Sequence, residues 1–235
     1  MKKIFLSFLV LNLIFNGIYS QSSSFNLSGY DETKIHYGFL LGVHSSYYRL
    51  NYSDEFTGTG YKNLHSINPK SIPGFKLGFI SDFNFLYPFS FRTLLQVSFS
   101  EYRLDYYYVD GTVFSDTRPS TLLETPLLIK YKSKRRKNHR MFMIAGIKPS
   151  LEIGAKNKDA AGKDILGLRA FDISLDIGFG SDIFFPLFKL SPEIRYSRGL
   201  RNMIKNKVIN EYNLPIDKII VHNISIFFTF EGGPK

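Results

Sequence analysis

The sequence predicts an all-β fold, an eight-stranded antiparallel transmembrane β-barrel, and three observations lead to this prediction. The first is a strict alternation of apolar with small or charged residues, clearest between Ala170 and Gly180, which indicates a strand with one apolar face and one polar face. The second is that this pattern recurs about eight times in a chain without cysteine. The third is an N-terminus with the features of a secretion signal. In a membrane barrel, lipid covers the apolar face and a narrow lumen takes the polar one.

Residues 1–20 predict a cleavable signal peptide. Lys2 and Lys3 supply the positive start, residues 4–15 are apolar, and small residues precede Gln21. The apolar stretch is shorter than the ~20 residues of a spanning helix, which argues against an uncleaved anchor. Without cysteine, a lipid-modified N-terminus and a disulfide framework are both excluded. We therefore expect a signal peptide at residues 1–20, an N-terminal periplasmic segment at residues 21–34 and an outer-membrane β-barrel at residues 35–235.

The first four predicted strands each carry a continuous apolar face. Such a face has to lie against lipid or a core, and period two identifies it as one side of a strand. These faces comprise Ile35, Tyr37, Phe39, Leu41 and Val43 in Ile35–Tyr48; Phe75, Leu77, Phe79, Phe83 and Phe85 in Ile72–Phe85; Phe91, Leu95, Val97 and Phe99 in Phe89–Tyr107; and Leu123, Leu127, Ile129 and Tyr131 in Thr121–Tyr131.

The last four predicted strands follow the same rule with one exception. In Arg140–Ile153 the apolar residues Phe142 and Ile144 fall on the face that is expected to point inward. Each of the eight segments is near or above the ~9–11 residues that a tilted strand needs to cross a bilayer. The other apolar faces comprise Phe171, Ile173, Leu175, Ile177 and Phe179 in Ala170–Phe185; Leu190, Ile194 and Tyr196 in Lys189–Ser197; and Ile220, Ile224, Ile226, Phe228 and Phe230 in Ile219–Phe230.

The predicted connections alternate between long and short. Outer-membrane barrels have short periplasmic turns and longer outer loops, so this alternation predicts an outer-membrane protein with both termini in the periplasm. A secreted soluble sandwich is the alternative, but it would have more and shorter strands. The long connections are Leu50–Ser71, Val109–Ser120, Gly154–Leu168 and Arg198–Lys218, and the short ones are Tyr87–Pro88, Lys132–His139 and Pro186–Phe188.

The polar faces predict a lumen that is filled rather than open. Eight strands enclose a space that side chains alone can fill, and buried charges are costly unless they are paired. Because both signs are present, we expect an internal network of ion pairs, with an ion path as the alternative; a diffusive porin would need a wider barrel. The residues expected inside include Lys76, Asp82, Arg92, Glu124, Lys130, Lys148, Glu152, Asp172, Asp176, Glu193 and Arg195.

The sequence offers no convincing catalytic or metal site. His36 and His44 share one strand face but lie ~26 Å apart along it, too far to share a proton or a metal. Asp172 and Asp176 are ~13 Å apart on the same basis. Gly178 and its neighbours interrupt a strand instead of opening a helix, so they do not form a phosphate loop. We expect no enzymatic activity, cofactor, metal, small-molecule substrate or nucleic acid.

The strongest local charge feature is Lys132–Arg140, with six formal positive charges in nine residues. On the predicted side assignment it is a periplasmic turn. It is either a solvated turn near anionic lipid head groups or a docking site for an acidic periplasmic partner. The docking hypothesis assigns partner contact to Lys134, Arg135, Arg136 and Lys137. The loop after Ser197 is also basic and would face the anionic outer leaflet; it contains Arg198, Arg201, Lys205 and Lys207.

Several segments resemble the PorT family of outer-membrane barrels. These are "KIHYGFLLGVHSSYYRL", "PGFKLGFISDFNF", "LETPLLIKYKSKRRKNHRMFMIAGIKPSLE" and "FDISLDIGFGSDIFFPLFKLSPEIRYSRGLRNM", of which "SPEIRYSRGLRN" is the most specific. The resemblance implies a non-enzymatic role in type IX protein secretion, which exports cargo with C-terminal sorting domains, and in gliding motility where present. It implies other secretion-system components and outer-membrane lipid as partners. The alternatives are an envelope-stabilising or adhesive barrel that binds ligands through its outer loops, and an outer-membrane hydrolase.

Overall fold

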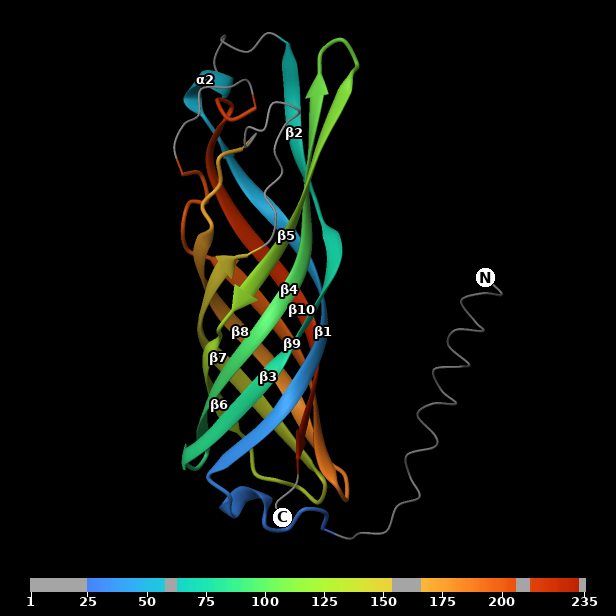
Figure 1. The fold of residues 1–235 in the computed structure, drawn as a ribbon, viewed down its shortest axis with the longest axis vertical. Coiled ribbons are helices and arrows are strands. Elements are labelled where there is room, and N and C mark those ends of the chain that lie inside the picture. The colour runs from blue at the N-terminus through green and yellow to red at the C-terminus, as the bar shows by residue number, and fades with distance from the viewer. Residues whose placement is uncertain (1–24, 58–62, 154–165, 206–211, 233–235) are drawn as a thin grey trace, which may run out of the picture.

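A computed structural model describes residues 25–57, 63–153, 166–205 and 212–232 of the chain. The predicted signal peptide lies outside the described residues. The described part is one long barrel, with the N-terminal residues from Phe25 onward and the end of the last strand at the same end (Figure 1). We call this the turn end, because short connections join strands there at residues 87–88, 133–138 and 185–187. The opposite end is the loop end.

The structure has ten strands that occupy eight positions around the barrel, which confirms the predicted all-β antiparallel class. β2 and β3 follow each other along one edge of β4, and β5 and β6 follow each other along its other edge. The strands are β1 (Ile35–Tyr52), β2 (Leu64–Lys70), β3 (Ile72–Leu86), β4 (Phe89–Tyr108), β5 (Val113–Glu124), β6 (Leu127–Lys132), β7 (His139–Glu152), β8 (Phe171–Phe184), β9 (Phe188–Gly199) and β10 (Ile216–Gly232). A 3-10 turn, η1 (Tyr30–Glu32), precedes β1, and a short helix, α2 (Asp54–Thr57), follows it.

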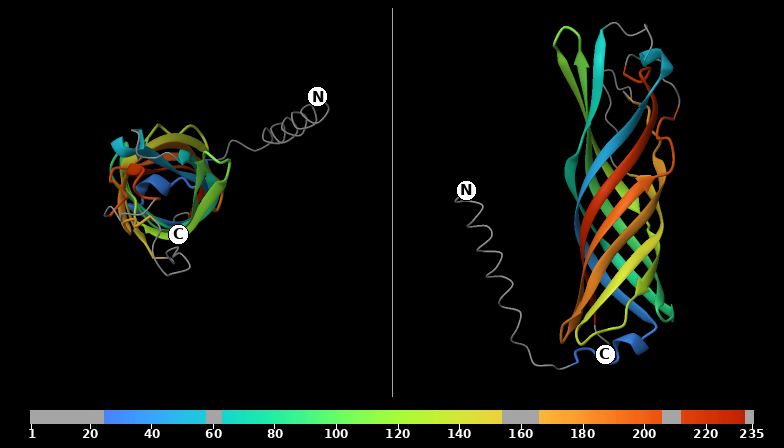
Figure 2. Two further views of the ribbon diagram at one scale, coloured as in Figure 1. Left: turned by 90° about the horizontal axis from the view of Figure 1, so that it is seen from above. Right: turned by 180° about the vertical axis from the view of Figure 1, so that it is seen from behind.

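The sheet closes into a ring, but unevenly. β1 pairs with β10, and antiparallel neighbours continue through β9 and β8 to β7 on one side and through β3 to β4 on the other. β6 joins β4 to β7 near the turn end. Above it, β5 and β7 pair over three residue pairs, from Leu122 with Glu152 to Glu124 with Ser150. The view along the axis shows the resulting closed ring (Figure 2).

Two predicted loops are largely strand, which corrects the sequence prediction. The expected connection Leu50–Ser71 contains α2 and β2, and the expected connection Val109–Ser120 contains the first part of β5. The link between β4 and β5 is therefore only residues 109–112. Gly111 has φ +85° there, and the Asp110 carboxylate accepts the Thr112 backbone N–H at 2.9 Å. Asp-Gly between β-prone residues is a strong hairpin signal that could have found this turn.

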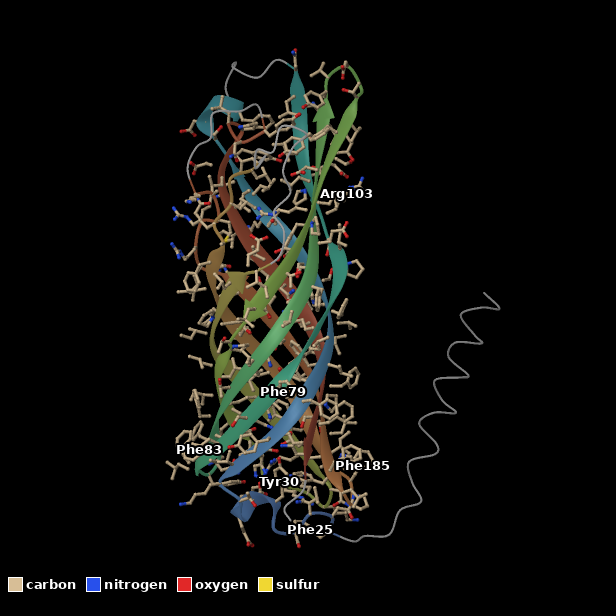
Figure 3. All side chains as sticks on the ribbon, viewed as in Figure 1. Phe25, Tyr30, Phe79, Phe83, Arg103 and Phe185 are labelled. Atoms are coloured by element: carbon tan, nitrogen blue, oxygen red, sulfur yellow. The ribbon has the colours of Figure 1, made fainter. Side chains whose placement is uncertain are left out.

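The barrel is apolar outside and charged inside, as the alternation predicts. Phe79 on β3 lies on the outer wall (Figure 3), where it is 72% exposed. Arg92 on β4 is fully buried. A soluble core would show the opposite arrangement. Among the described residues, no helix is long and apolar enough to cross a membrane.

At the loop end, β2, β4 and β5 continue beyond the ring as a three-stranded ribbon (Figure 1). An apolar cluster lies beneath it, where Tyr48 of β1 stacks on Tyr102 of β4 with ring centroids 4.5 Å apart. Ile67 and Tyr106 from the ribbon are fully buried in the same cluster. Aromatic and aliphatic side chains thus pack over the lumen at the loop end.

Candidate functional site

The lumen near the turn end is organised around one arginine. The Arg92 guanidinium donates to Asp82 on β3 at 2.8 Å, and to Glu193 on β9 and Glu231 on β10 at 3.2 Å each. All four side chains are buried. Hydrogen-bonded pairing of this kind is the condition under which charges are tolerated away from water. The cluster ties four strands together across the lumen.

A second cluster is centred on the buried carboxylate of Asp182 on β8. It accepts from Lys130 on β6 and Arg140 on β7, both at 2.9 Å, and from the hydroxyl of Ser191 on β9 at 2.7 Å. The three donors come from three different strands. Each lumen carboxylate of the two clusters therefore has at least one cationic partner.

Apolar side chains fill the middle of the lumen and explain the exception in the predicted fifth strand. Phe142 and Ile144 of β7 point inward, as expected, and pack with Phe227 of β10 and other apolar residues. The ammonium of Lys130 lies 3.9 Å from the centroid of the Phe142 ring, a cation–π contact. A Cβ at Gly180 would lie 2.4 Å from the Phe142 ring, so glycine is required for this packing.

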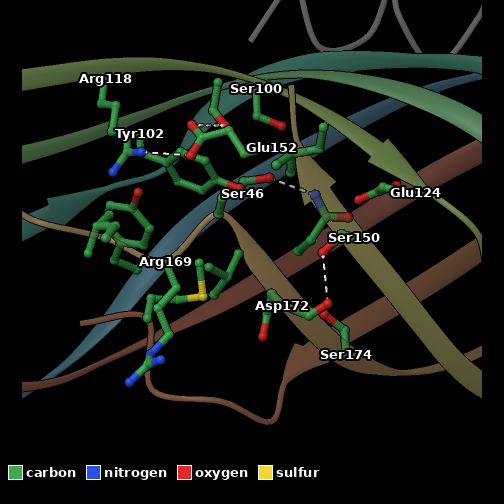
Figure 4. A pocket seen from close by; sticks show the side chains of 18 of the residues that line it. Ser46, Ser100, Tyr102, Arg118, Glu124, Ser150, Glu152, Arg169, Asp172 and Ser174 are labelled. Atoms are coloured by element: carbon green, nitrogen blue, oxygen red, sulfur yellow. Dashed lines mark hydrogen bonds and ion pairs between the residues drawn. The ribbon is translucent and has the colours of Figure 1, made fainter. Parts of the chain in front are cut away.

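Towards the loop end, the lumen narrows to a small cavity of about 40 Å³ (Figure 4). Lys148 of β7 and Lys76 of β3 lie 3.0 and 3.1 Å from the carboxylate of Glu124 on β5 beside it. Across the cavity, Arg118 donates to Glu152 at 2.7 Å. At ~10–15 Å³ for each water centre, the space holds about three water molecules, whereas drug-sized ligands need ~300 Å³ or more. The internal ion-pair network is thus present, and the described residues leave no wide path through it.

The N-terminal segment closes the lumen at the turn end, a feature that sequence reasoning missed. Residues 25–33, here called the cap, place the ring of Tyr30 in the mouth of the barrel, where it is 1% exposed. The Tyr30 hydroxyl donates to Glu231 at 2.6 Å, and its ring stacks on His36 of β1 with centroids 3.8 Å apart. Lys189 of β9 lies 4.6 Å from the same ring. The cap therefore packs into the mouth of the barrel and adds Tyr30 to the charged network of the lumen.

One residue of the predicted docking turn holds the cap in place. The Arg135 guanidinium lies 3.6 Å from the ring centroid of Phe184 on β8 and 3.9 Å from that of Phe25 in the cap. It also donates to the backbone carbonyl oxygens of Asn26 and Leu27. Burial lowers the pKa of this guanidinium from its usual value. The side chain of Arg135 is thus committed to contacts within the chain.

The other three residues of the docking hypothesis are exposed. Lys134, Arg136 and Lys137, here called the basic surface, point away from the barrel at the turn end. Lys134 and Arg136 line an open hollow of about 470 Å³ together with Ser133 and His139. The structure therefore separates the four predicted residues into one that anchors the cap and three that remain accessible.

The described residues do not assemble a catalytic or metal-binding group. His44 Nε2 lies 3.0 Å from Ser100 Oγ inside the barrel, but His44 Nδ1 has no hydrogen-bond partner in the described part of the chain. The acid that would orient such a histidine is therefore missing from the described residues. No group of three or more His, Asp or Glu side chains within them could hold a metal ion.

The cap should loosen at acidic pH through Asp31. Its carboxylate accepts from Arg140 Nη1 at 2.6 Å. Burial alone would raise the pKa of Asp31, but Arg140, together with Lys132 and Arg135, outweighs this effect and lowers the pKa below its ordinary value. The contact is therefore fully formed above the ordinary carboxyl pKa of ~4 and is lost as pH falls through the lower folded value.

Hydrogen exchange of the Tyr30 and Glu32 amides, which donate to Leu27 and Gly29 within the cap, measures this loosening. We expect Asp31→Asn to reduce their protection at pH 7, and the difference from wild type to shrink as pH falls through the lowered pKa of Asp31. A difference between wild type and variant that stays constant with pH would contradict the assignment.

Comparison with known proteins identifies the family. The model of the outer membrane protein beta-barrel domain matches residues 19–205. No match was found among curated proteins.

Solved structures of three small barrels are similar in fold. OprG from Pseudomonas aeruginosa shares 12% identity over 84% of this chain and 93% of its own, with a TM-score of 0.48. Neisserial surface protein A shares 11% over 81% and 95%, with a TM-score of 0.42. Ail of Yersinia pestis, in complex with the heparin analogue sucrose octasulfate, shares 14% over 85% and 99%, with a TM-score of 0.38.

The family model covers well over half of the chain, including the cap and β1 to β9. Its description agrees with the outward apolar face and the closed antiparallel ring. The chain therefore belongs to the outer membrane protein β-barrel domain family, and its barrel lies in the outer membrane.

Proposed function

We propose that this protein is a non-enzymatic accessory of type IX secretion, required for export of cargo with C-terminal sorting domains and for gliding motility where present. The resemblance of the quoted segments to the PorT family suggests this system. The short connections at the turn end support an orientation with this end, the cap and both termini in the periplasm, as is general for outer-membrane barrels.

The filled lumen is the observation that carries the accessory role. Arg92 and Asp182 each bridge several strands across the interior, and the cap closes one end. The cavity of about 40 Å³ near the loop end is far too small for a polypeptide. A barrel filled in this way would act through its surfaces, as a membrane anchor that binds other secretion components.

The basic surface is the part of the turn end best suited to such binding. Lys134, Arg136 and Lys137 are exposed and form no ion pair with any described residue. Positive charge without an internal partner attracts an acidic partner and speeds encounter with it. We assign partner contact to these three residues, and a supporting role to Arg135, which fixes the cap beside them.

Reversal of the three charges tests the proposal. In a deletion strain, the variant Lys134→Glu/Arg136→Glu/Lys137→Glu should leave the barrel folded in the outer membrane but fail to restore cargo to the medium. Cargo would then accumulate in the cell, as in the deletion strain itself. The measurement is quantitative proteomics of medium and envelope, with co-purification of envelope partners from the same strains.

A charge-preserving variant is the matched control. Lys134→Arg/Arg136→Lys/Lys137→Arg changes the same three side chains and should restore export fully. Normal export by the charge-reversed variant, at an equal level of folded barrel, would refute the docking role. An unchanged secretome in the deletion strain would refute the secretion role as a whole.

The ribbon at the loop end favours one alternative, an adhesive barrel. β2, β4 and β5 project beyond the ring and are braced by the apolar cluster around Tyr106. A rigid projection of this kind would suit contact with a surface ligand. In that case export would be normal in the deletion strain, and shortening the ribbon between Arg103 and Arg118 would abolish binding to that ligand.

A further inference from the structure

Five cations gather on the outer wall of the barrel near the loop end. Arg49 on β1 and Arg198 on β9 are exposed on the outward faces of their strands. The segments next to β8 and β9 contribute the other three: Arg169, Arg201 and Lys205. We call these five residues the basic belt. They come from distant parts of the sequence and are brought together by the order β1-β10-β9-β8 in the sheet.

A buried histidine with two tyrosines links the first two members of the belt. His222 of β10 pairs with Arg198 in the register on one side and with Tyr47 on the other. Its Nδ1 lies 2.6 Å from the hydroxyl of Tyr196, and its ring stacks on that of Tyr47 with centroids 5.4 Å apart. Arg49 lies two residues beyond Tyr47 on the same face. The rings of Tyr47, His222 and Tyr196 support one another and make this part of the outer wall rigid.

The other three members line a hollow of about 250 Å³. Its floor is apolar, and Phe171 at the start of β8 lies 5.6 Å below the guanidinium of Arg201. Arg169 borders both this hollow and the lumen cavity (Figure 4), and its Nε donates to the carbonyl oxygen of Ile204 at 3.3 Å. Lys205 lies beside it on the rim. The hollow therefore combines fixed cations with an apolar floor.

The belt has little internal counter-charge in the described part of the chain: the carboxylate of Asp172 on β8 attracts Arg201, but the two form no ion pair. None of its five cations lies within ion-pair distance of a described carboxylate, whereas Arg103 on β4, at the same end, is paired with Asp105 at 2.7 Å. Asp172, next to Phe171 on β8, is buried in the lumen. Clustered cations without partners repel one another, so a bound anion would stabilise this arrangement.

The outer wall below the belt is continuously apolar. Leu175 and Ile177 on β8, Ile194 on β9, and Ile224 and Ile226 on β10 are all exposed on it. A ligand that meets both surfaces has an anionic head at the level of the belt and apolar chains along these strands. Guanidinium groups bind phosphate through paired hydrogen bonds, and basic pockets beside membrane-facing surfaces bind phosphorylated head groups.

We propose that the basic belt is a binding site for a phosphorylated glycolipid of the outer leaflet. Its phosphate groups bind Arg198 and, at the hollow, Arg201 and Lys205, and its acyl chains lie along β8, β9 and β10. The site rests on the orientation proposed above, in which the loop end faces outward, and is independent of the secretion role.

Charge removal at the belt, compared with equal charge removal at the other end, tests this proposal. The purified barrel in neutral detergent is titrated with bisphosphorylated lipid A, and bound lipid is counted by native mass spectrometry. Arg198→Gln/Arg201→Gln/Lys205→Gln should weaken binding on the order of 10- to 100-fold, because each cation near a membrane surface contributes to attraction of anionic lipid. Lys134→Gln/Arg136→Gln/Lys137→Gln should bind as wild type does. Heat-dependent mobility on gels verifies that both variants are folded.

Two further probes identify the ligand chemistry. Wild-type protein should bind dephosphorylated lipid A as weakly as the belt variant binds the phosphorylated form, and millimolar inorganic phosphate should not displace the lipid. Equal binding by the belt variant, an equal loss in the opposite-end control, or equal binding of the dephosphorylated lipid would each overturn the proposal. Full displacement by inorganic phosphate would make this a site for free anions and would also overturn it.

Discussion

Replacement of Arg92 by methionine is expected to destabilise the barrel by about 3–5 kcal/mol, because it removes one buried cation that three buried carboxylates share. Asp82, Glu193 and Glu231 all accept from this one guanidinium. Lys130, Lys189 and Arg195 remain beside these carboxylates, so the variant leaves three carboxylates with weaker pairing. Methionine fills much of the same space, so the loss comes from this change in charge and not from a cavity. Urea unfolding of the barrel reconstituted in lipid vesicles measures the change in the free energy of unfolding.

Two companion variants separate charge from packing in that experiment. Arg103→Met removes an arginine on the same strand whose side chain is 44% exposed, and should change stability by less than about 1 kcal/mol. Arg92→Met combined with Glu193→Gln and Glu231→Gln removes two of the three carboxylates that lose Arg92 and should recover part of the loss. Equal stability of Arg92→Met and Arg103→Met would show that the lumen network does not hold the barrel together.

Replacement of Tyr30 by alanine should release the cap. The ring is almost fully buried against His36 and Phe184, and truncation of a buried aromatic side chain costs about 3–5 kcal/mol. Tyr30→Phe keeps the ring and loses the hydrogen bond to Glu231, which should cost about 1.5–3 kcal/mol because its acceptor is charged. Limited proteolysis of residues 25–33 and amide exchange measure the release.

The control for this experiment lies in the same turn. Glu32 is exposed, so Glu32→Ala should leave protection of the cap within about 0.5 kcal/mol of wild type. The loss of protection of the cap should be largest in Tyr30→Ala, smaller in Tyr30→Phe and smallest in Glu32→Ala. Protection of residues 25–33 that is unchanged in Tyr30→Ala would show that Phe25 and Arg135 hold the cap without the tyrosine.

The strands of the barrel wall could be predicted because alternate residues face lipid, which favours apolar side chains, and the lumen, which takes polar ones. This alternation is visible within a short stretch of sequence. Segments such as 171–179 therefore indicate both that a strand is present and which face points outward. β2 and the outer half of β5 were missed because they leave the ring, where neither face meets lipid. There the useful signal was local turn chemistry, at Asp110-Gly111.

The lumen residues were predictable as a set, but their pairing was not. Arg92 meets partners 10, 101 and 139 residues away, and the strand register alone decides which carboxylates reach it. The cap shows no periodicity, and its contacts depend on a mouth that exists only after the sheet has closed. The docking hypothesis therefore treated Arg135 as equal to its neighbours, although its ring contacts set it apart.

The place that receives Tyr30 is built last. Glu231 lies at the end of β10, and β10 closes the ring against β1, so the acceptor and the mouth are assembled only when the C-terminal strand is in place. Until then residues 25–33 lack the Glu231 acceptor and the closed mouth around Tyr30. Burial of the cap thus depends on insertion of the strands through β10, and an exposed cap is expected in a barrel whose last strand has not yet paired with β1.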